Sequence, residues 1–203
     1  PGMTESQVAA EAEYAMRRAG AAEFWRTYVS SGPRTNIAHG LPTLRKLQAG
    51  DLVMIDIHPI VNGYSADICR TVCVGKPTTE QQATYDLYLK AQQSTIAKVK
   101  AGVGMVELEQ TLHEVIKGGG HDGHIFGPPI HGVGIDFEES PLPPGHAFFH
   151  GEKEPPPLET NVVIAVGNCG LYTGSWGVRV EDTVVVGPKG PVILTEYPRQ
   201  LGK

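Results

Sequence analysis

Apolar and polar residues alternate along the chain with helical spacing in three stretches. Capping-box spacings and runs of helix-forming residues predict helices over 4–18 and from 79 toward 102. A third helix is predicted over about 106–117, where three consecutive glycines follow. Strands are predicted as well as helices, so the pattern as a whole predicts an α+β fold.

Shorter runs of apolar and β-branched residues predict the strands. They fall at Thr27–Val29, Leu52–Ile55, Ser65–Val74, Val162–Val166, Val178–Val186 and Val192–Leu194. Asn62-Gly63 is a turn signal between the second and third of these strands. The stretch 141–157 is rich in proline and glycine, which predicts a loop.

A weak internal repeat relates the two parts of the chain. Ala38-His39-Gly40 resembles Ile130-His131-Gly132, and the apolar run 51–56 has the outline of 161–166. Each run leads through a glycine-containing turn toward an acidic residue, Asp67 or Glu181. We therefore expect one domain over 1–203 made of two related α/β halves, with polar residues of both halves meeting at a central cleft.

Length, charge and cysteine content narrow the class of protein. A chain of 203 residues suits one large domain. The net charge of −5 argues against a nucleic-acid or anionic-membrane partner, and no run of 18 apolar residues occurs. Three cysteines without a CxxC pair indicate free thiols and favour the cytoplasm. The Pro1-Gly2 opening without methionine suggests a fragment of a longer chain.

The candidate chemistry lies in three acidic residues and one histidine. Asp56 and Asp67 fall on neighbouring predicted strands, while His131 and Glu181 come from the other half. Convergence of these oxygen and nitrogen donors predicts a divalent-metal site that suits manganese, cobalt, iron or zinc. Buried strand-end acids need a balancing cation. The alternative interpretation is that these acids face solvent.

Several stretches, in the same order along the whole chain, resemble the catalytic domain of the prolidase, aminopeptidase P, methionine aminopeptidase and creatinase family. They are 1–5, 31–40, 50–56, 63–71, His131-Gly-Val-Gly134 and 177–183. The opening stretch and Gly177-Val-Arg-Val-Glu181-Asp182 are most similar to those of the Xaa-Pro peptidases. The resemblance implies the pita-bread fold, in which two pseudo-symmetric halves surround a metal cleft. Larger members carry an extra N-terminal domain, and this chain is expected to begin where that domain ends.

The resemblance also implies a role for each matching residue. Asp56 would bind one metal ion, Asp67 and Glu181 would bridge two ions, and His131 would bind the other. His39 matches a histidine that contacts the reacting amide, and Arg179 matches an arginine near the active site. A metal-bound hydroxide would then attack the scissile carbonyl.

One ligand of the family pattern is missing. A glutamate is expected in a Glu-Pro-Gly-(Ile/Leu)-Tyr stretch, but this chain has Val166-Gly-Asn-Cys-Gly-Leu-Tyr172. Either Asn168 or Gly167 takes the place of that glutamate, depending on the alignment. Asn168 could still offer a carbonyl oxygen, but a neutral ligand binds a cation less strongly. We therefore expect one or two divalent ions, manganese or cobalt first, with one position weak.

Two further departures bear on the site. Glu138 takes the place of the family's second histidine, where it could bind metal, transfer a proton or select a cationic group. His58 stands where the family often has glycine. It is either a packed or solvent-facing residue, or it rebuilds the site together with Glu138. Tyr64 and Trp176 are, with His58, candidates for substrate binding, although aromatic residues also suit the core.

The sequence therefore favours a metal-dependent hydrolase of the Xaa-Pro peptidase type that cleaves a peptide or peptide-like C–N bond. One alternative is a non-catalytic member that binds peptides in the same cleft. Another is a creatinase-like or lyase-like enzyme that acts on a small non-peptide substrate. The expected partners are a peptide or small molecule and a second copy of the chain in a homodimer.

Overall fold

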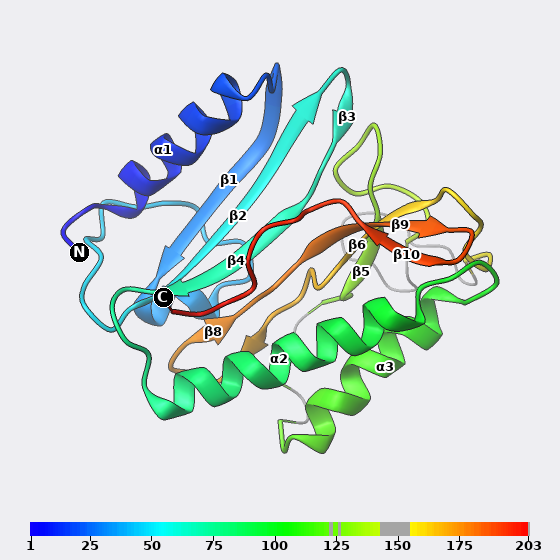
Figure 1. The fold of residues 1–203 in the computed structure, drawn as a ribbon. Helices are drawn as coiled ribbons and strands as arrows, with labels where there is room; N and C mark the ends of the chain where they lie inside the picture. The colour runs from blue at the N-terminus through cyan, green and yellow to red at the C-terminus, as the bar shows by residue number, and fades with distance from the viewer. Residues whose placement is uncertain (122–123, 126, 143–154, 203) are drawn as a thin grey trace.

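Two antiparallel sheets and three helices form the framework of the protein (Figure 1). The computed structural model describes residues 1–202 apart from 122–123, 126 and 143–154. Its elements are α1 (Glu5–Arg18), β1 (Glu23–Ser31), η1 (Gly32–Asn36), β2 (Leu52–Val61), β3 (Tyr64–Ser65), β4 (Ile68–Cys73), α2 (Thr79–Lys98), α3 (Met105–Gly118), β5 (Ile130–Gly132), β6 (Val163–Val166), β7 (Leu171–Tyr172), β8 (Gly177–Val178), β9 (Asp182–Gly187) and β10 (Gly190–Ile193).

The first sheet is organised around β2, which pairs antiparallel with β1, β3 and β4. Helix α1 packs along β1 (Figure 1). Asn62 and Gly63 connect β2 to β3 with φ angles of 52° and 82°. Positive φ at both central residues is what a two-residue hairpin turn of type I′ requires, so the predicted turn is confirmed. The β1–β2 register shifts between Phe24 and Thr27, which marks a bulge in β1.

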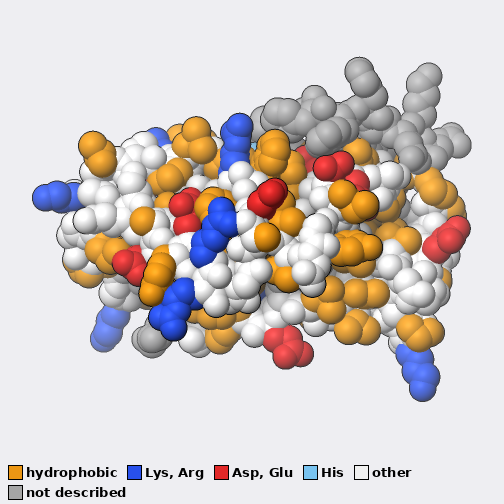
Figure 2. Space-filling model, turned by 90° about the horizontal axis from the view of Figure 1, so that it is seen from above, with side chains coloured by type: hydrophobic (Ala, Val, Ile, Leu, Met, Phe, Trp, Pro, Cys, Tyr) orange, Lys and Arg blue, Asp and Glu red, His pale blue; other side chains and the backbone are white. Residues whose placement is uncertain are grey.

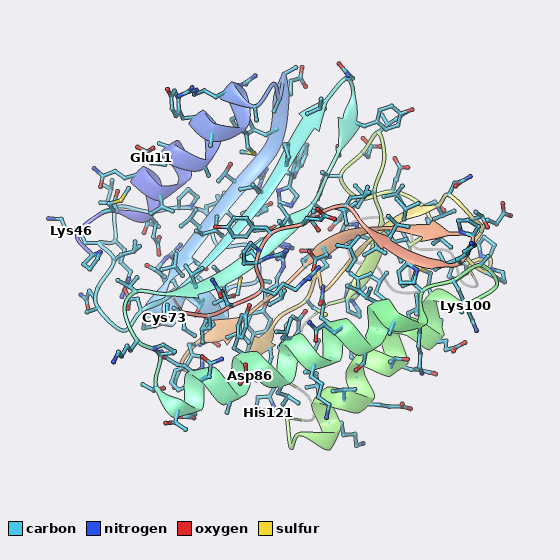
Figure 3. All side chains as sticks on the ribbon, viewed as in Figure 1. Glu11, Lys46, Cys73, Asp86, Lys100 and His121 are labelled. Atoms are coloured by element: carbon cyan, nitrogen blue, oxygen red, sulfur yellow. The ribbon has the colours of Figure 1, made fainter. Side chains whose placement is uncertain are left out.

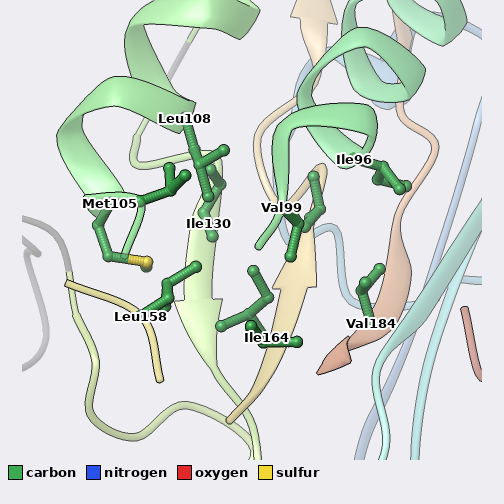
Figure 4. Close-up of a cluster of buried hydrophobic side chains, with 11 residues drawn as sticks. Ile96, Val99, Met105, Leu108, Ile130, Leu158, Ile164 and Val184 are labelled. Atoms are coloured by element: carbon green, nitrogen blue, oxygen red, sulfur yellow. The ribbon is translucent and has the colours of Figure 1, made fainter. Parts of the chain in front are cut away.

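The second sheet has the strand order β10-β9-β6-β5, and α2 and α3 pack against it. Eleven buried apolar residues fill the space between the helices and the sheet (Figure 4). Ile96 and Val99 at the end of α2 face Ile164 of β6 and Val184 of β9 across this core (Figure 4). Burial of such side chains contributes roughly 1.5–3 kcal/mol each. The core holds β5, β6 and β9 in fixed positions relative to α2 and α3.

The two sheets are joined by backbone contacts at Cys69 and Glu181. The Glu181 N–H donates to the Cys69 carbonyl at 3.0 Å, and the Cys69 N–H donates to the Glu181 carbonyl at 3.3 Å. Nearby, the Thr183 hydroxyl donates to the Asp67 carbonyl at 2.7 Å and accepts from the Asp67 N–H at 3.0 Å. The junction therefore sets two acidic residues from different halves beside each other.

The predicted helices are confirmed, but two predicted strands are interrupted. Thr78 rather than Thr79 caps α2, which ends at Lys98. The prediction of one strand over 65–74 was wrong, because β3 ends at Ser65 and β4 begins at Ile68. The prediction over 178–186 was wrong in the same way. At the breaks, the backbone N–H groups of Asp67 and Glu181 bond to Thr183 and Cys69 of the facing half, which a local pattern does not record.

The surface and the remaining segments agree with the composition. On the face shown in Figure 2, basic and acidic side chains are interspersed among apolar ones. The three cysteines are free thiols, as predicted. Among the described residues, none of the helices has the length and apolar character to cross a membrane. Most of the loop predicted over 141–157 lies outside the described residues.

Glu5 fixes the start of α1 to the first sheet. Its fully buried carboxylate accepts hydrogen bonds from the backbone N–H and the hydroxyl of Ser31 at 2.8 and 2.7 Å, and from those of Thr43 at 3.0 and 2.6 Å. Arg34 adds an ion pair at 3.1 Å. Burial alone would raise the pKa of Glu5, but the hydrogen bonds from Thr43 and Ser31 outweigh it and lower the pKa.

We expect Glu5→Gln to lower the free energy of unfolding by about 2–3 kcal/mol at pH 7, because the donors of Ser31, Thr43 and Arg34 lose a charged acceptor. A lowered carboxyl pKa stabilises the fold above the unfolded pKa, and this contribution is lost as pH falls through the folded pKa. The gap between wild type and variant should therefore shrink below about pH 4. Urea unfolding at pH 7 and pH 3 measures it, with the exposed Glu11→Gln on the same helix as the control. An equal gap at both pH values would contradict this account.

Candidate metal centre

Four side chains with metal-binding chemistry meet where the two sheets join. Asp56 lies on β2, Asp67 just before β4, His131 in β5 and Glu181 just before β9. Each is at most 1% exposed. The convergence predicted from the sequence is therefore confirmed, and the alternative of solvent-facing acids is wrong.

The three acids of this centre are buried, unlike many charged side chains of the chain. Charged side chains such as Glu11, Asp86 and Lys100 are exposed and project from the outer elements (Figure 3). Water solvates such groups, so they need no partner. A carboxylate in the interior has no such solvation and requires a cation or hydrogen-bond donors.

The first cluster consists of Asp56, His58 and Asp67, each of which offers a donor atom within 4.8 Å of the other two. His58 Nε2 lies 3.6 Å from Asp56 Oδ1 and 3.4 Å from Asp67 Oδ1. Its other ring nitrogen, Nδ1, lies 2.8 Å from the Arg26 carbonyl oxygen. Because a carbonyl only accepts, Nδ1 carries the hydrogen, and Nε2 is the atom presented to the two carboxylates.

The second cluster consists of Asp67, His131 and Glu181. His131 Nε2 lies 3.6 Å from both Asp67 Oδ2 and Glu181 Oε1. His131 Nδ1 is 3.0 Å from the Gly132 carbonyl oxygen, which assigns its hydrogen in the same way. Asp67 therefore contributes one carboxylate oxygen to each cluster and links the two.

Arg179 supplies the fixed positive charge of the centre. Its fully buried guanidinium donates to Asp56 Oδ2 at 2.8 Å and to Glu181 Oε2 at 2.5 and 3.0 Å. It also donates to the Ala38 carbonyl at 3.2 Å, beside His39. Arg179 thus occupies one oxygen of each carboxylate and leaves Asp56 Oδ1 and Glu181 Oε1 directed at the clusters.

The electrostatics of the centre follow from burial and mutual proximity. Burial raises the pKa values of Asp56 and Asp67, and neighbouring carboxylates add to this. Burial would also raise the pKa of Glu181, but Arg179 and His131 lower it to about 2. Burial would lower the pKa values of His58 and His131, but the facing carboxylates raise them to about 10 and about 9. The pKa values of Asp56, Asp67, His58 and His131 therefore respond to neighbouring negative charge, and that of Glu181 responds to Arg179 and His131.

Unpaired buried atoms show that the residues fit divalent metal ions. Among the described residues, Asp56 Oδ1, Asp67 Oδ1, His131 Nε2 and Glu181 Oε1 are buried without a hydrogen-bond partner. All four belong to the two clusters. Such atoms are costly to leave unpaired, and a divalent ion with carboxylate and imidazole ligands would satisfy them together.

A cavity of about 390 Å³ is lined by His39 and Glu138 together with Trp25, Arg26, Tyr28, Leu41 and Phe137. The rings of Trp25 and Phe137 stack at 4.8 Å, and His58 meets Phe137 edge-on at 5.5 Å. The cavity therefore adjoins the first cluster. Burial and the nearby Arg179 lower the pKa of His39 to about 4, so this imidazole is neutral at pH 7.

The aromatic lining of this cavity was missed in the sequence. Trp25 lies in the β1 bulge and Phe137 in a loop, so no periodicity connects them. The single available signal was Phe137 next to Glu138.

The backbone around Gly167 and Asn168 bears on which residue stands at the missing glutamate. Gly167 has φ of +113°, and a Cβ there would lie 2.0 Å from the Val180 carbonyl oxygen. A side chain at Gly167 would clash with this carbonyl, which favours Asn168 as the counterpart of the glutamate, and that assignment stays a prediction. Asn168 is buried and its Nδ2 lies 3.5 Å from Glu138 Oε1. Two residues that depart from the family pattern are therefore neighbours.

The three residues predicted to bind substrate lie in three different places. His58 lies with Asp56 and Asp67 and is 2% exposed, so it does not face solvent, and its ring packs against Tyr28 and Phe137. Its predicted substrate contact stays a prediction. Tyr64 is 66% exposed and lines a different groove, with Gly134 and Thr183. Trp176 packs against the core around Tyr85 and Leu171. Substrate contacts of Tyr64 and Trp176 stay predictions.

Solved structures of peptidases share this architecture. The X-Pro aminopeptidase from Thermotoga maritima superimposes with a TM-score of 0.90 at 33% identity, covering 99% of this chain and 55% of that one. The prolidase from Pyrococcus horikoshii gives 0.90 at 31% identity, covering 98% and 56%. The pita-bread α+β fold predicted from the sequence is confirmed.

Sequence comparison gives the same family. The Xaa-Pro dipeptidase of Pyrococcus furiosus is 33% identical over 202 residues, which cover 98% of this chain and 56% of that protein. The chain thus spans about half the length of such relatives. The profile of metallopeptidase family M24 matches residues 1–188. With this match and the clusters described above, the chain belongs to metallopeptidase family M24.

Proposed function

We propose that this chain carries a metal-dependent hydrolase centre of the Xaa-Pro peptidase type, which cleaves a peptide or peptide-like C–N bond. The observation that carries the proposal is the pair of buried clusters that share Asp67 next to a cavity containing His39 and Glu138. Relatives named Xaa-Pro dipeptidase and prolidase support the substrate class.

The two clusters would hold the metal ions, with Asp56, Asp67, His131 and Glu181 as the ligands expected from the family. Divalent ions at such a site activate water and stabilise the oxyanion of the scissile carbonyl. Manganese or cobalt is the proposed metal, with iron or zinc as alternatives. We further propose that the position beside His131 is the weaker one, because the family resemblance expects a ligand glutamate where this chain has the uncharged Asn168.

The other polar residues would bind and orient the substrate. His39 is neutral at pH 7, so it can hydrogen-bond the reacting amide without adding charge. Glu138 is 5% exposed and lies at the cavity, where its carboxylate can carry a proton to the leaving amine in place of the missing glutamate. Arg179 orients Asp56 and Glu181 through its hydrogen bonds.

Domain organisation, assembly and location are part of the proposal. Contacts between the two sheets at Cys69 and Glu181 support one domain over 1–203. Burial of the thiols of Cys69 and Cys169 supports a cytoplasmic location, where thiols stay reduced. A homodimer stays a prediction.

Hydrolysis of an Xaa-Pro dipeptide panel, with Xaa-Ala dipeptides as controls, tests the function. We expect cleavage of the proline dipeptides with Mn²⁺ or Co²⁺, loss of cleavage with a chelator, and recovery when the metal is restored. Absence of cleavage with metal bound would favour the peptide-binding alternative. Turnover that a chelator leaves untouched would favour a metal-free enzyme of small substrates.

We expect Asp67→Asn to change the free energy of unfolding differently with and without metal. In a chelator, the variant should be at least as stable as the wild type, and about 1 kcal/mol more stable if repulsion dominates, because one buried negative charge is gone. With Co²⁺ at 100 times its dissociation constant, the wild type should gain about 2.7 kcal/mol and the variant far less. Thermal unfolding in both conditions measures these differences.

The matched control is Asp182→Asn, which changes the residue next to Glu181. Asp182 is saturated by Arg70, Thr195, Arg199 and Gln92. The Asp182→Asn variant should therefore lose the same free energy of unfolding with and without metal. Similar behaviour of the two variants would contradict a metal role for Asp67.

We expect Asn168→Glu to strengthen the binding of the weaker ion about tenfold, which corresponds to about 1.4 kcal/mol. The new carboxylate would face Glu138, so the variant should lose stability in a chelator. The double variant Asn168→Glu/Glu138→His removes this repulsion and should regain the lost stability. Calorimetric titration with Mn²⁺ measures the affinity, and an unchanged second affinity would contradict the assignment of Asn168.

A further inference from the structure

His58 repeats the geometry of His131 on the opposite side of Asp67. In both histidines Nδ1 faces a backbone carbonyl, at 2.8 Å from Arg26 and 3.0 Å from Gly132. In both, Nε2 faces two carboxylate oxygens at 3.4–3.6 Å. A carbonyl at Nδ1 is the device by which proteins orient metal-ligating histidines.

The β1 bulge supplies the carbonyl that orients His58. The register passes from Phe24 opposite Pro59 to Thr27 opposite Ile57, so Trp25 and Arg26 fall in the irregular stretch facing His58. The Arg26 carbonyl is therefore available to the His58 side chain. The rings of Tyr28 and Phe137 meet the imidazole edge-on at 5.7 and 5.5 Å and restrict its rotation.

The donor atoms of the first cluster have the spacing of metal ligands. An ion at about 2.0–2.2 Å from each ligand keeps neighbouring ligand atoms roughly 3.0–3.6 Å apart. His58 Nε2 lies within this range of Asp56 Oδ1 and Asp67 Oδ1. Both carboxylate oxygens are buried and lack a hydrogen-bond partner among the described residues.

Arg179 holds Glu181 away from the first cluster, which leaves that cluster with two carboxylates and room for a third ligand. It holds Glu181 Oε2 at 2.5 Å, and Glu181 does not belong to the first cluster in the described structure. Without His58, Asp56 and Asp67 alone would face an ion there. The imidazole supplies the third donor from the same strand as Asp56.

We propose that His58 is a metal ligand, whose Nε2 completes a site for one divalent ion with Asp56 Oδ1 and Asp67 Oδ1. Each of the two metal positions then has one imidazole and two carboxylates, joined through Asp67. A nitrogen donor favours cobalt or zinc over manganese at the first position. The inference rests on the proposed function only in that metal ions bind at this centre.

Metal titration of the chelator-treated 203-residue chain tests the inference without any substrate. The probes are Co²⁺, followed by its visible absorption and by calorimetry, and Mn²⁺, followed by pulsed electron paramagnetic resonance of nitrogen coupling. The wild type should bind two ions, each coupled to a histidine nitrogen. His58→Gly should weaken one position at least about tenfold and abolish one of the two nitrogen couplings.

Two further variants separate ligation from folding. His39→Gly removes a cavity histidine outside both clusters and should leave both couplings intact. His58→Gln keeps a polar side chain without the nitrogen donor and should behave as His58→Gly does. If it instead binds both ions as the wild type does, His58 is not a ligand.

The remaining outcomes also decide the question. Unchanged couplings in His58→Gly would overturn the inference. Tighter metal binding in His58→Gly would overturn it too, since the imidazole would then occupy the position as a cation in place of a metal. A chain that binds two histidine-coupled ions yet cleaves no Xaa-Pro dipeptide would overturn the proposed function and leave the role of His58 intact.

Discussion

Buried negative charge is the constraint around which this structure is built. Asp56, Asp67 and Glu181 lie in the interior, and among the described residues Arg179 is the guanidinium that contacts two of them. One guanidinium does not balance three carboxylates in a low-dielectric interior, and the imidazoles of His58 and His131 respond to the excess, with pKa values raised to about 10 and about 9. The oxygens that Arg179 leaves uncovered all point at two places. A fold that directs them there is arranged to receive cations.

The opposite orientations of the Glu181 and Asp182 side chains show how the backbone directs one acid into the centre. Consecutive residues at the start of a strand point to opposite faces. Asp182 turns toward Arg70 and Arg199 and helps to close the second sheet against the C-terminal segment. Glu181 turns into the junction between the sheets, where its backbone pairs with Cys69. The same break in the strand therefore provides both a structural acid and a candidate ligand.

The departures from the family pattern form one connected region and do not lie scattered over the chain. Asn168 contacts Glu138, Glu138 lines the cavity beside Phe137, and Phe137 packs on His58. With Asn168 taken as the counterpart of the family's glutamate, a carboxylate is lost at position 168 and another stands at 138, so the number of acidic groups around the centre would be kept. The region thus retains its negative charge while the placement of its donors changes. Such a change is expected to alter metal preference and leaving-group chemistry more than it alters the fold.

Local patterns were sufficient for the helices and for the Asn62-Gly63 turn, because capping and turn conformation are encoded within a few residues. The convergence of Asp56, Asp67, His131 and Glu181 was predicted with the help of the family motifs. Tertiary structure decided the rest. Asp67 and Glu181 lie in strand breaks because their neighbours bond to the other half of the molecule. The side chain of His58 faces Asp56 and Asp67 because a bulge in β1 and the ring of Phe137 direct it there. These contacts join residues tens of positions apart, and a periodicity read along one chain contains no record of them.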